Sequence, residues 1–365
     1  MLTDELFTNK SLFEKPSPSS RFEGFGGYLP AAVRTTSDLV RELQLSSPLP
    51  VQAVTGVAQR RVYDPRPEAG EDSFGLALRA ARDALDKSRY TAADIDVVIC
   101  ACIIRIKDGD DLYFEPSFAG MLARELGAEH ALHFDVSNAC AGMMTGVYLV
   151  DRMIRAGLVR TGLVVSAEQA TRIAQTASRE LTGVRDPQFA SLSVGDSAAA
   201  VVLDRSVDEA DRIHYVEMMT CAGYTDLCFG MPSERSEGLA MYTASGRMQH
   251  EDRIRTWAAY HRDRLAERGS TFGGEGFDYV IHHQVSTRVI GKLNAVGAEV
   301  LGSAMPASLS VVEKYGNCAS TSHFVTLREH LRAGTARQGS KFLLVPAASG
   351  LVFGVLSATI SNLGV

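Results

Sequence analysis

The most regular pattern of apolar and polar positions begins at Asp72. Apolar side chains recur there at spacings of four, three and four residues, at Phe74, Leu78, Ala81 and Leu85. Side chains at this spacing fall on one face of an α-helix, so the pattern predicts an amphipathic helix. After Tyr90, residues 96–102 are apolar on both faces, which is typical of a strand in a parallel sheet that is covered on both sides.

The same order of a helix and an apolar strand returns later in the chain. A helical pattern over 252–267 precedes the apolar segment 277–283. When Asp278 is aligned with Asp96, the offset is 182 residues (278 − 96). This offset is close to half of the chain.

A second pair of segments repeats at a similar distance. Each copy consists of a helix-opening loop, a helix that ends in Arg-Ala-Gly and an apolar strand: 138–142, 155–157 and 162–166, then 316–320, 332–334 and 342–345. Gly334 follows Gly157 by 177 residues (334 − 157). Coincidence is the alternative, but agreement in both order and offset favours an internal duplication of an α/β unit.

The duplication divides the chain into three predicted parts. Residues 1–20 form an N-terminal lead-in segment, 21–205 the first half and 206–365 the second half. Equivalent loops from the two halves would meet in one place, which is where a site is expected.

Composition excludes several classes of protein. The 365 residues are 45% hydrophobic and 22% charged with a net charge of −6, which argues against a nucleic-acid partner. The longest purely apolar run, Val97–Ile104, is far short of the roughly 20 residues that a membrane span needs. The first ten residues carry acids and no signal-peptide core, so we expect a cytoplasmic protein. Six cysteines without a CxxC spacing indicate reduced thiols and no metal centre.

Three residues at predicted loop ends are candidates for catalytic roles. Cys140 precedes an almost wholly apolar helical segment, 143–154, and a helix N-terminus favours the thiolate that makes a cysteine nucleophilic. His283 follows an apolar strand, and Asn317 opens the second-half helix. Taken singly, a packing cysteine, a satisfied polar histidine and a helix N-cap are the simpler interpretations. The duplication favours a shared site, because it places all three at corresponding loop ends.

The motifs around these residues resemble the condensing enzymes of the thiolase superfamily, of the ketoacyl-ACP synthase III type. The resemblance runs from about Arg21 to the C-terminus and rests on these segments: Thr55-Gly56-Val57 with Arg60-Arg61, 134–142, 194–200, His283-Gln284, Tyr315-Gly316-Asn317 and Ser349-Gly350-Leu351. It implies a thiolase-like five-layered αβαβα fold built from two duplicated halves. It also implies no cofactor beyond the phosphopantetheine of acyl carrier protein (ACP) or CoA, which carries the substrates.

The resemblance assigns a role to each site residue. Cys140 takes the first acyl group from a thioester, and the backbone N–H groups of Cys140 and Ser349 form the oxyanion hole. His283 and Asn317 donate hydrogen bonds to the second thioester as enolate charge develops on its oxygen. Loss of one such donor typically costs about 3–4 kcal/mol of transition-state stabilisation.

Glu115 departs from the pattern of the fatty-acid-initiating synthases, which usually carry an aromatic residue there. A carboxylate at this position resembles the head-to-head acyl-condensing branch, in which a partner subunit supplies it to remove an α-proton. The segments 138–140 and 165–168 resemble the same branch. The resemblance therefore implies a homodimer in which Glu115 acts across the interface; an exposed loop glutamate is the alternative.

Other departures bear on the substrate carrier. Val54 and Pro50 stand where the initiating synthases place residues that hold the CoA adenine, and Cys318 and Ser286 replace a usual Thr and Asn. Arg288 keeps the basic residue associated with ACP docking, although it could equally be a solvated helix charge. ACP thioesters are thus favoured over CoA esters for at least one substrate.

These features predict Claisen condensation of two acyl thioesters in a specialised lipid or polyketide pathway of the alkylresorcinol, pyrone or ketone type. The first alternative is decarboxylative initiation of fatty-acid synthesis with malonyl-ACP. The second is acyl transfer to an alcohol or amine, and the third is a non-enzymatic partner subunit, which the intact Cys140 disfavours.

Overall fold

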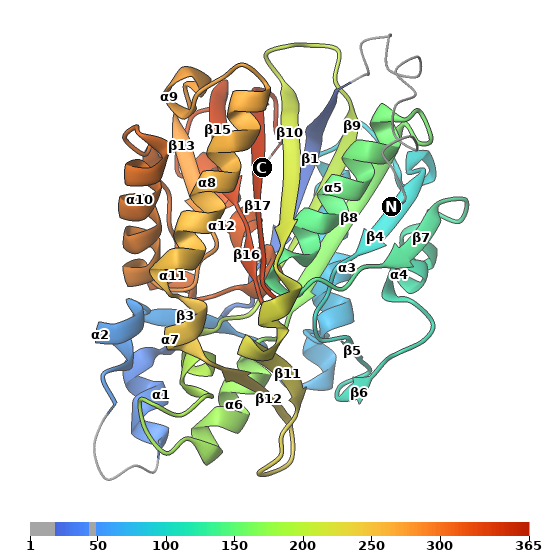
Figure 1. The fold of residues 1–365 in the computed structure, drawn as a ribbon. Helices are drawn as coiled ribbons and strands as arrows, with labels where there is room; N and C mark the ends of the chain where they lie inside the picture. The colour runs from blue at the N-terminus through green and yellow to red at the C-terminus, as the bar shows by residue number, and fades with distance from the viewer. Residues whose placement is uncertain (1–18, 44–48, 365) are drawn as a thin grey trace, which may run out of the picture.

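The computed structural model describes residues 19–43 and 49–364, so the predicted lead-in segment lies almost entirely outside the described residues. Two mixed β-sheets stand side by side at the centre (Figure 1). In the first sheet the strand order is β1 (Ser20–Tyr28), β9 (Ser197–Arg205), β8 (Thr161–Glu168), β4 (Val97–Cys100) and β7 (Leu132–Asp135). In the second it is β10 (Arg212–Thr220), β17 (Val352–Ile360), β15 (Ser340–Val345), β13 (Tyr279–His282) and β14 (Ala307–Ser308).

The two sheets repeat the same pattern of strand directions. The first two pairings in each order are antiparallel, β1 with β9 and β9 with β8, and β10 with β17 and β17 with β15. The last two pairings in each order are parallel. The topology is therefore duplicated strand for strand.

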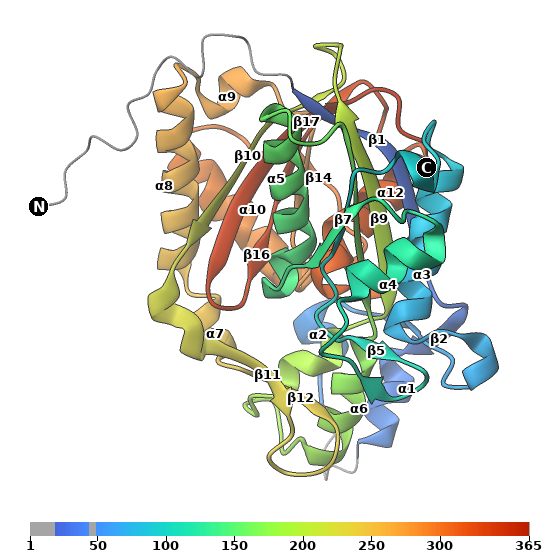
Figure 2. The same ribbon diagram turned by 90° about the vertical axis from the view of Figure 1, so that its right-hand side faces the viewer.

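Helices form three further layers around the sheets (Figures 1 and 2). The outer face of the first sheet carries α3 (Ser73–Asp86) and α4 (Phe118–Leu126), and that of the second carries α8 (Glu251–Glu267) and α10 (Thr287–Leu301). Between the sheets lie α5 (Gly142–Arg155) and α12 (Ser322–Arg332), whose Val147 and Phe324 share one core with Ile99 and Phe342 from the two sheets. The predicted five-layered αβαβα fold is thus confirmed.

Local sequence explains the best-predicted elements. Asp72 caps α3 by accepting a hydrogen bond from the Gly75 N–H at 2.7 Å, and the helix buries Phe74 and Ala81 against the first sheet. The predicted strand over 96–102 is β4, buried along its whole length. The helix predicted at 252–267 is α8, and the strand that follows it is β13.

Shorter elements gather at one end of the sheets, below them in Figure 1. They are β2 (Ala32–Thr35), α1 (Thr36–Glu42), α2 (Val51–Thr55), β3 (Gln59–Val62), β5 (Ile106–Lys107), β6 (Asp111–Leu112), α6 (Thr171–Glu180), the hairpin β11 (Cys228–Pro232) and β12 (Leu239–Thr243), and α7 (Ser245–Met248). Within residues 19–43 and 49–364, every helix is too short or too polar to cross a bilayer.

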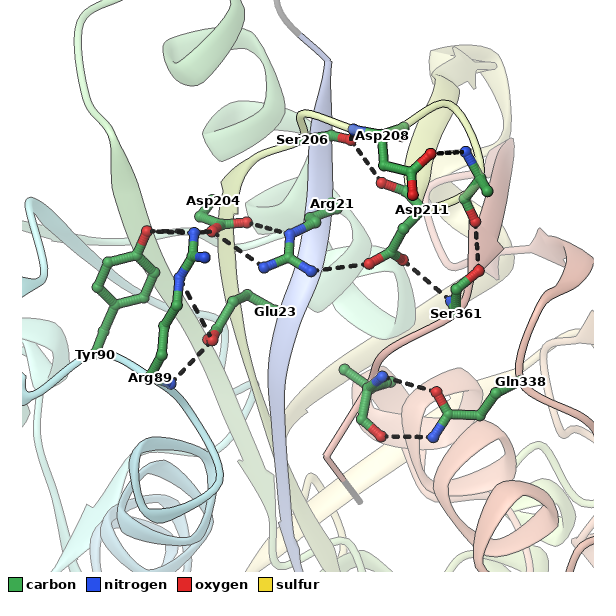
Figure 3. Close-up of polar contacts among 12 residues, drawn as sticks. Arg21, Glu23, Arg89, Tyr90, Asp204, Ser206, Asp208, Asp211, Gln338 and Ser361 are labelled. Carbon is green, nitrogen blue, oxygen red and sulfur yellow. Dashed lines mark hydrogen bonds and ion pairs between the residues drawn. The ribbon is translucent and has the colours of Figure 1, made fainter.

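One arginine links strands from the two sheets at the opposite end (Figure 3). Arg21 of β1 donates to Asp204 of β9 at 2.9 Å and to Asp211, just before β10, at 2.8 Å. Asp211 in turn accepts from the Ser361 N–H, which follows β17, at 3.1 Å. The guanidinium group therefore connects the first sheet to both neighbouring strands of the second.

Candidate active site

Cys140 lies in a tight turn of the first half that has an equivalent in the second half. The turn Ala139–Ala141 leads into α5, and the turn Ala319–Thr321 leads into α12. Ala139 (φ 44°) and Ala319 (φ 49°) both adopt left-handed backbone conformations, which are unusual for alanine. These equivalent turns are 180 residues apart (319 − 139), between the two offsets obtained from the sequence. The strained turn places the half-buried Cys140 at the end of the middle helical layer.

A cavity of about 100 Å³ joins four of the predicted site residues, which are Cys140, His283, Asn317 and Ser349. They come from four different segments, and apolar side chains such as Ile254, Leu293 and Phe353 form much of the remaining wall. The cavity thus places a thiol and two polar side chains in apolar surroundings, where water competes poorly for their hydrogen bonds.

The thiol of Cys140 does not behave as its position at a helix N-terminus suggested. Burial raises the pKa of Cys140, and the nearby Cys228 and Glu168 raise it further. A backbone N–H lowers the pKa, but by less. The expected thiolate is therefore wrong for the resting protein, because desolvation outweighs the effect of the helix terminus.

His283 is a neutral imidazole. It directly follows β13, its backbone N–H donates to the Val345 carbonyl at 3.1 Å, and its side chain is buried. Burial, followed by repulsion from a proton on the nearby His323, lowers the pKa of His283 to about 3. Its Nδ1 is buried without a partner, so Nε2 is the ring nitrogen left to face the cavity.

Backbone contacts hold Asn317 on both sides. Its N–H donates to the Ser193 carbonyl at 2.8 Å, and its carbonyl accepts from the Gly195 N–H at 3.0 Å. The side-chain Oδ1 accepts from the Ala319 N–H at 2.9 Å. Since that contact requires an oxygen, the Nδ2 amide group is left as a donor for the cavity. Gly316 precedes it with φ 70°, and a Cβ there would lie 2.4 Å from the Ser193 carbonyl oxygen.

Glu168 is a buried carboxyl group that the sequence did not single out as a site residue. Its Oε1 accepts from Ser166 at 3.1 Å and from Ser320, and burial raises the pKa of Glu168 to about 8. Ser320 follows Ala319 in the turn equivalent to that of Cys140. The sequence signal was a Ser-x-Glu at the end of the apolar strand β8, which marks a polar group entering the core.

Two predicted residues lie outside this cavity. Glu115 is exposed in the loop between β6 and α4. Arg288 is exposed in the first turn of α10. The structure of one chain therefore brings neither residue to Cys140.

The described cysteines are all free thiols, with Cys100, Cys102 and Cys318 buried. In the part of the chain that the structure describes, no group of three His, Cys, Asp or Glu side chains is placed to hold a metal ion.

Comparison with known proteins identifies the family. The family model described as 3-oxoacyl-[acyl-carrier-protein (ACP)] synthase III matches residues 134–222, and that of its C-terminal domain matches residues 270–360. The beta-ketoacyl-[acyl-carrier-protein] synthase III of Alkalilimnicola ehrlichii is 31% identical over 92% of this chain and 97% of its own length. The chain belongs to the ketoacyl-ACP synthase III family. Its members are condensing enzymes, so the predicted family and the broad class of activity are confirmed.

Solved structures of related fold agree with the architecture. The 3-oxoacyl-ACP synthase III of Pseudomonas aeruginosa is 25% identical and matches with a TM-score of 0.74 over 94% of this chain and 98% of its own. The OleA protein of Xanthomonas campestris is 21% identical and matches with a TM-score of 0.77 over 94% of this chain and 98% of its own. At 21% identity, the match to OleA supports only the fold of this ketoacyl-ACP synthase III family member.

Proposed function

We propose that this protein condenses two acyl thioesters by a Claisen reaction through an acyl-Cys140 intermediate. The observation that carries the proposal is the shared cavity, in which one thiol meets a neutral imidazole and an amide whose oxygen is already occupied. A nucleophile and two preorganised donors are what acyl transfer followed by enolate stabilisation requires.

In the first step, the Sγ of Cys140 attacks the carbonyl carbon of an acyl thioester. The thiol is protonated at rest, and its proton passes to the departing phosphopantetheine thiol. Backbone N–H groups of Cys140 and Ser349 stabilise the transient oxyanion. The carbon–sulfur bond of the donor breaks as that of acyl-Cys140 forms.

In the second step, a carbanion forms on the α-carbon of a second thioester. Glu115, supplied by a partner subunit, removes the α-proton, while His283 and Asn317 donate to the enolate oxygen. The α-carbon attacks the acyl-Cys140 carbonyl, a carbon–carbon bond forms as the carbon–sulfur bond to Cys140 breaks, and the departing sulfur takes up the proton that Glu115 removed, which restores both groups. The product is a β-ketoacyl thioester.

A homodimer is part of this proposal. Strand β7 is an edge strand of the first sheet, and its Leu132 is 58% exposed. Phe114, adjacent to Glu115, is 73% exposed. An edge strand beside exposed apolar side chains favours pairing with a second copy, and such pairing is the route by which Glu115 would reach the other site.

The substrates are acyl groups carried on ACP or CoA, and the exposed Arg288 would contact an acidic carrier protein. We assign the reaction to a specialised lipid or polyketide pathway of the alkylresorcinol, pyrone or ketone type in the cytoplasm. Residues 21–205 and 206–365 would act as two halves around one site, with no cofactor of their own. Decarboxylative condensation with malonyl-ACP is the second candidate, and similarity to the beta-ketoacyl-ACP synthase III of Alkalilimnicola ehrlichii is equally consistent with it.

The test measures product from a malonyl donor and from a saturated acyl donor, together with released carbon dioxide. Glu115→Gln should abolish condensation of the saturated donor. Acylation of Cys140, followed by intact-protein mass spectrometry, should be unchanged in this variant. The control variant Glu129→Gln should leave both steps unchanged. Cys140→Ala should abolish acylation. The reaction is decarboxylative instead if three results are obtained together: carbon dioxide is released in step with product, Glu115→Gln does not change this, and the saturated donor does not react.

A further inference from the structure

A second, basic hollow lies along β1, the edge strand of the first sheet that is farthest from β7. It has a volume of about 560 Å³ and shares no lining residue with the Cys140 cavity. Four cationic side chains line it: Arg61, Lys314, Arg328 and Arg332. We call this hollow the basic groove.

Most of the positive charge in the basic groove is not neutralised by protein carboxylates. Among the described residues, Lys314 and Arg332 form no ion pair, and Arg61 donates only to main-chain carbonyls, of which Ala31 is nearest at 2.9 Å. The one acid in the lining, Glu329, already accepts from Tyr315 at 2.5 Å and from Arg328 at 3.2 Å. Three cations are left uncompensated in a chain whose net charge is −6.

Arg328 is held in the groove at a cost. Its side chain is 12% exposed and passes directly over Gly27, where a Cβ would lie 3.1 Å from its Cδ. The Nε atoms of Arg328 and Arg61 are buried without hydrogen-bond partners. Burial and the neighbouring Arg332 lower the pKa of Arg328. Crowded like charges are unfavourable, and an anion bound in the groove would relieve that repulsion.

We propose that the basic groove binds a small molecule that carries phosphate groups. Guanidinium groups present paired donors that match phosphate oxygens. Tyr28 and Tyr315 line the same wall, but Tyr315 is 2% exposed, so the half-buried Tyr28 is the ring that a ligand could contact. A concave site with a ring beside cations fits a nucleoside polyphosphate or a free polyphosphate; both share the diphosphate group that the arginines would bind.

The test is isothermal titration calorimetry of the full-length protein with inorganic pyrophosphate and, separately, with ADP. The wild-type protein should bind at least one of them saturably below about 1 mM. Lys314→Ala combined with Arg332→Ala should weaken that binding at least about tenfold, because two phosphate contacts are lost. Both side chains are exposed, so an unchanged melting temperature is expected. Arg337→Ala removes an exposed charge outside the groove and should change affinity by less than about twofold.

The outcomes separate the possible ligands. Tighter binding of ADP than of pyrophosphate would indicate a nucleotide, and equal binding a free polyphosphate. The proposal is overturned by the absence of saturable binding of either probe, by full affinity in the double variant, or by an equal loss of affinity in Arg337→Ala.

Discussion

The imidazole rings of His283 and His323 are stacked, with their centroids 5.9 Å apart and their planes inclined by 26°. The Val345 carbonyl accepts two hydrogen bonds, one from the backbone N–H of His283 at 3.1 Å and one from the ring Nε2–H of His323 at 3.0 Å. Because a carbonyl only accepts, the neutral His323 carries its proton on Nε2. His323, the second residue of α12, thus fixes the strand end from which His283 reaches the cavity.

Replacing His323 with Phe tests whether it positions His283 and keeps it neutral. The phenyl ring keeps the stacking, but it removes the donor to Val345 and the second titrating ring. Since His323 lowers the pKa of His283, that pKa should rise in the variant, and the acidic limb of the kcat profile should move to higher pH. We expect kcat to fall about tenfold with KM unchanged. His330→Phe, farther along α12, should leave the profile unchanged, and a His323→Phe profile identical to wild type would contradict the prediction.

Asn317→Asp should separate the two half-reactions. The carboxylate can still accept from the Ala319 N–H, but it cannot donate to an enolate and it adds a negative charge beside it. Condensation should therefore fall at least about 100-fold, which is the usual effect of losing one oxyanion donor. Acylation of Cys140, followed by intact-protein mass spectrometry, should continue within about threefold of wild type. Equal loss of both steps would argue that Asn317 maintains the loop and makes no contact with the enolate.

Glu168 should limit the reactivity of Cys140 at high pH. As the pH rises through about 8, Glu168 ionises, and its negative charge further disfavours the Cys140 thiolate. Alkylation of Cys140 by iodoacetamide should then increase less than about tenfold per pH unit between pH 8 and 9. Glu168→Gln should restore the full increase and react faster above pH 9. The Cys140 peptide is quantified by mass spectrometry, because Cys221 and Cys228 are also partly exposed; equal slopes would refute the coupling.

The chain is expected to lose stability as the pH falls below about 6.5. Burial lowers the pKa of five histidines to between about 3 and 4, namely His214, His261, His282, His283 and His323. The unfolded chain binds protons on these groups below pH 6.5 and the native chain does not, so unfolding is favoured as pH falls towards 4. Glu168 and Asp196, whose pKa values burial raises to about 8 and about 6, act in the opposite direction.

The histidines outnumber these two acids, so we expect a net loss on the order of 3 kcal/mol in unfolding free energy between pH 7 and pH 5. Urea denaturation at both pH values measures it. A flat or rising stability over that interval would mean that these histidines become protonated inside the native protein.

Patterns of neighbouring residues in the sequence predict the helices and strands that are set by interactions within each segment. The spacing of apolar residues after Asp72 gave α3, and the apolar run at Val97 gave β4. The motif around Cys140 and the loop ends at His283 and Asn317 led to residues that do line one cavity.

The sequence did not predict the contacts between distant segments. His323 reaches His283 and Glu168 reaches Ser320 only because two helices and two sheets pack together. The thiolate expected at Cys140 failed for the same reason: the helix terminus is a local feature, but desolvation comes from the whole surrounding fold.

Arg21→Leu should destabilise the protein where its two sheets meet (Figure 3). Asp204 is 1% exposed and Asp211 3% exposed, so removal of the arginine leaves the buried Asp211 without a charged partner and Asp204 with one fewer. Asp204 retains Arg89 and the Tyr90 hydroxyl, whereas Asp211 keeps the Ser361 N–H. We expect a loss of about 3 kcal/mol in unfolding free energy, at the low end for a broken buried pair, measured by urea denaturation. Arg160→Leu breaks a pair with Asp96 in which the arginine side chain is 86% exposed, and it should cost less than about 1 kcal/mol. Equal effects of the two substitutions would mean that Arg21 contributes no more than an ordinary surface charge.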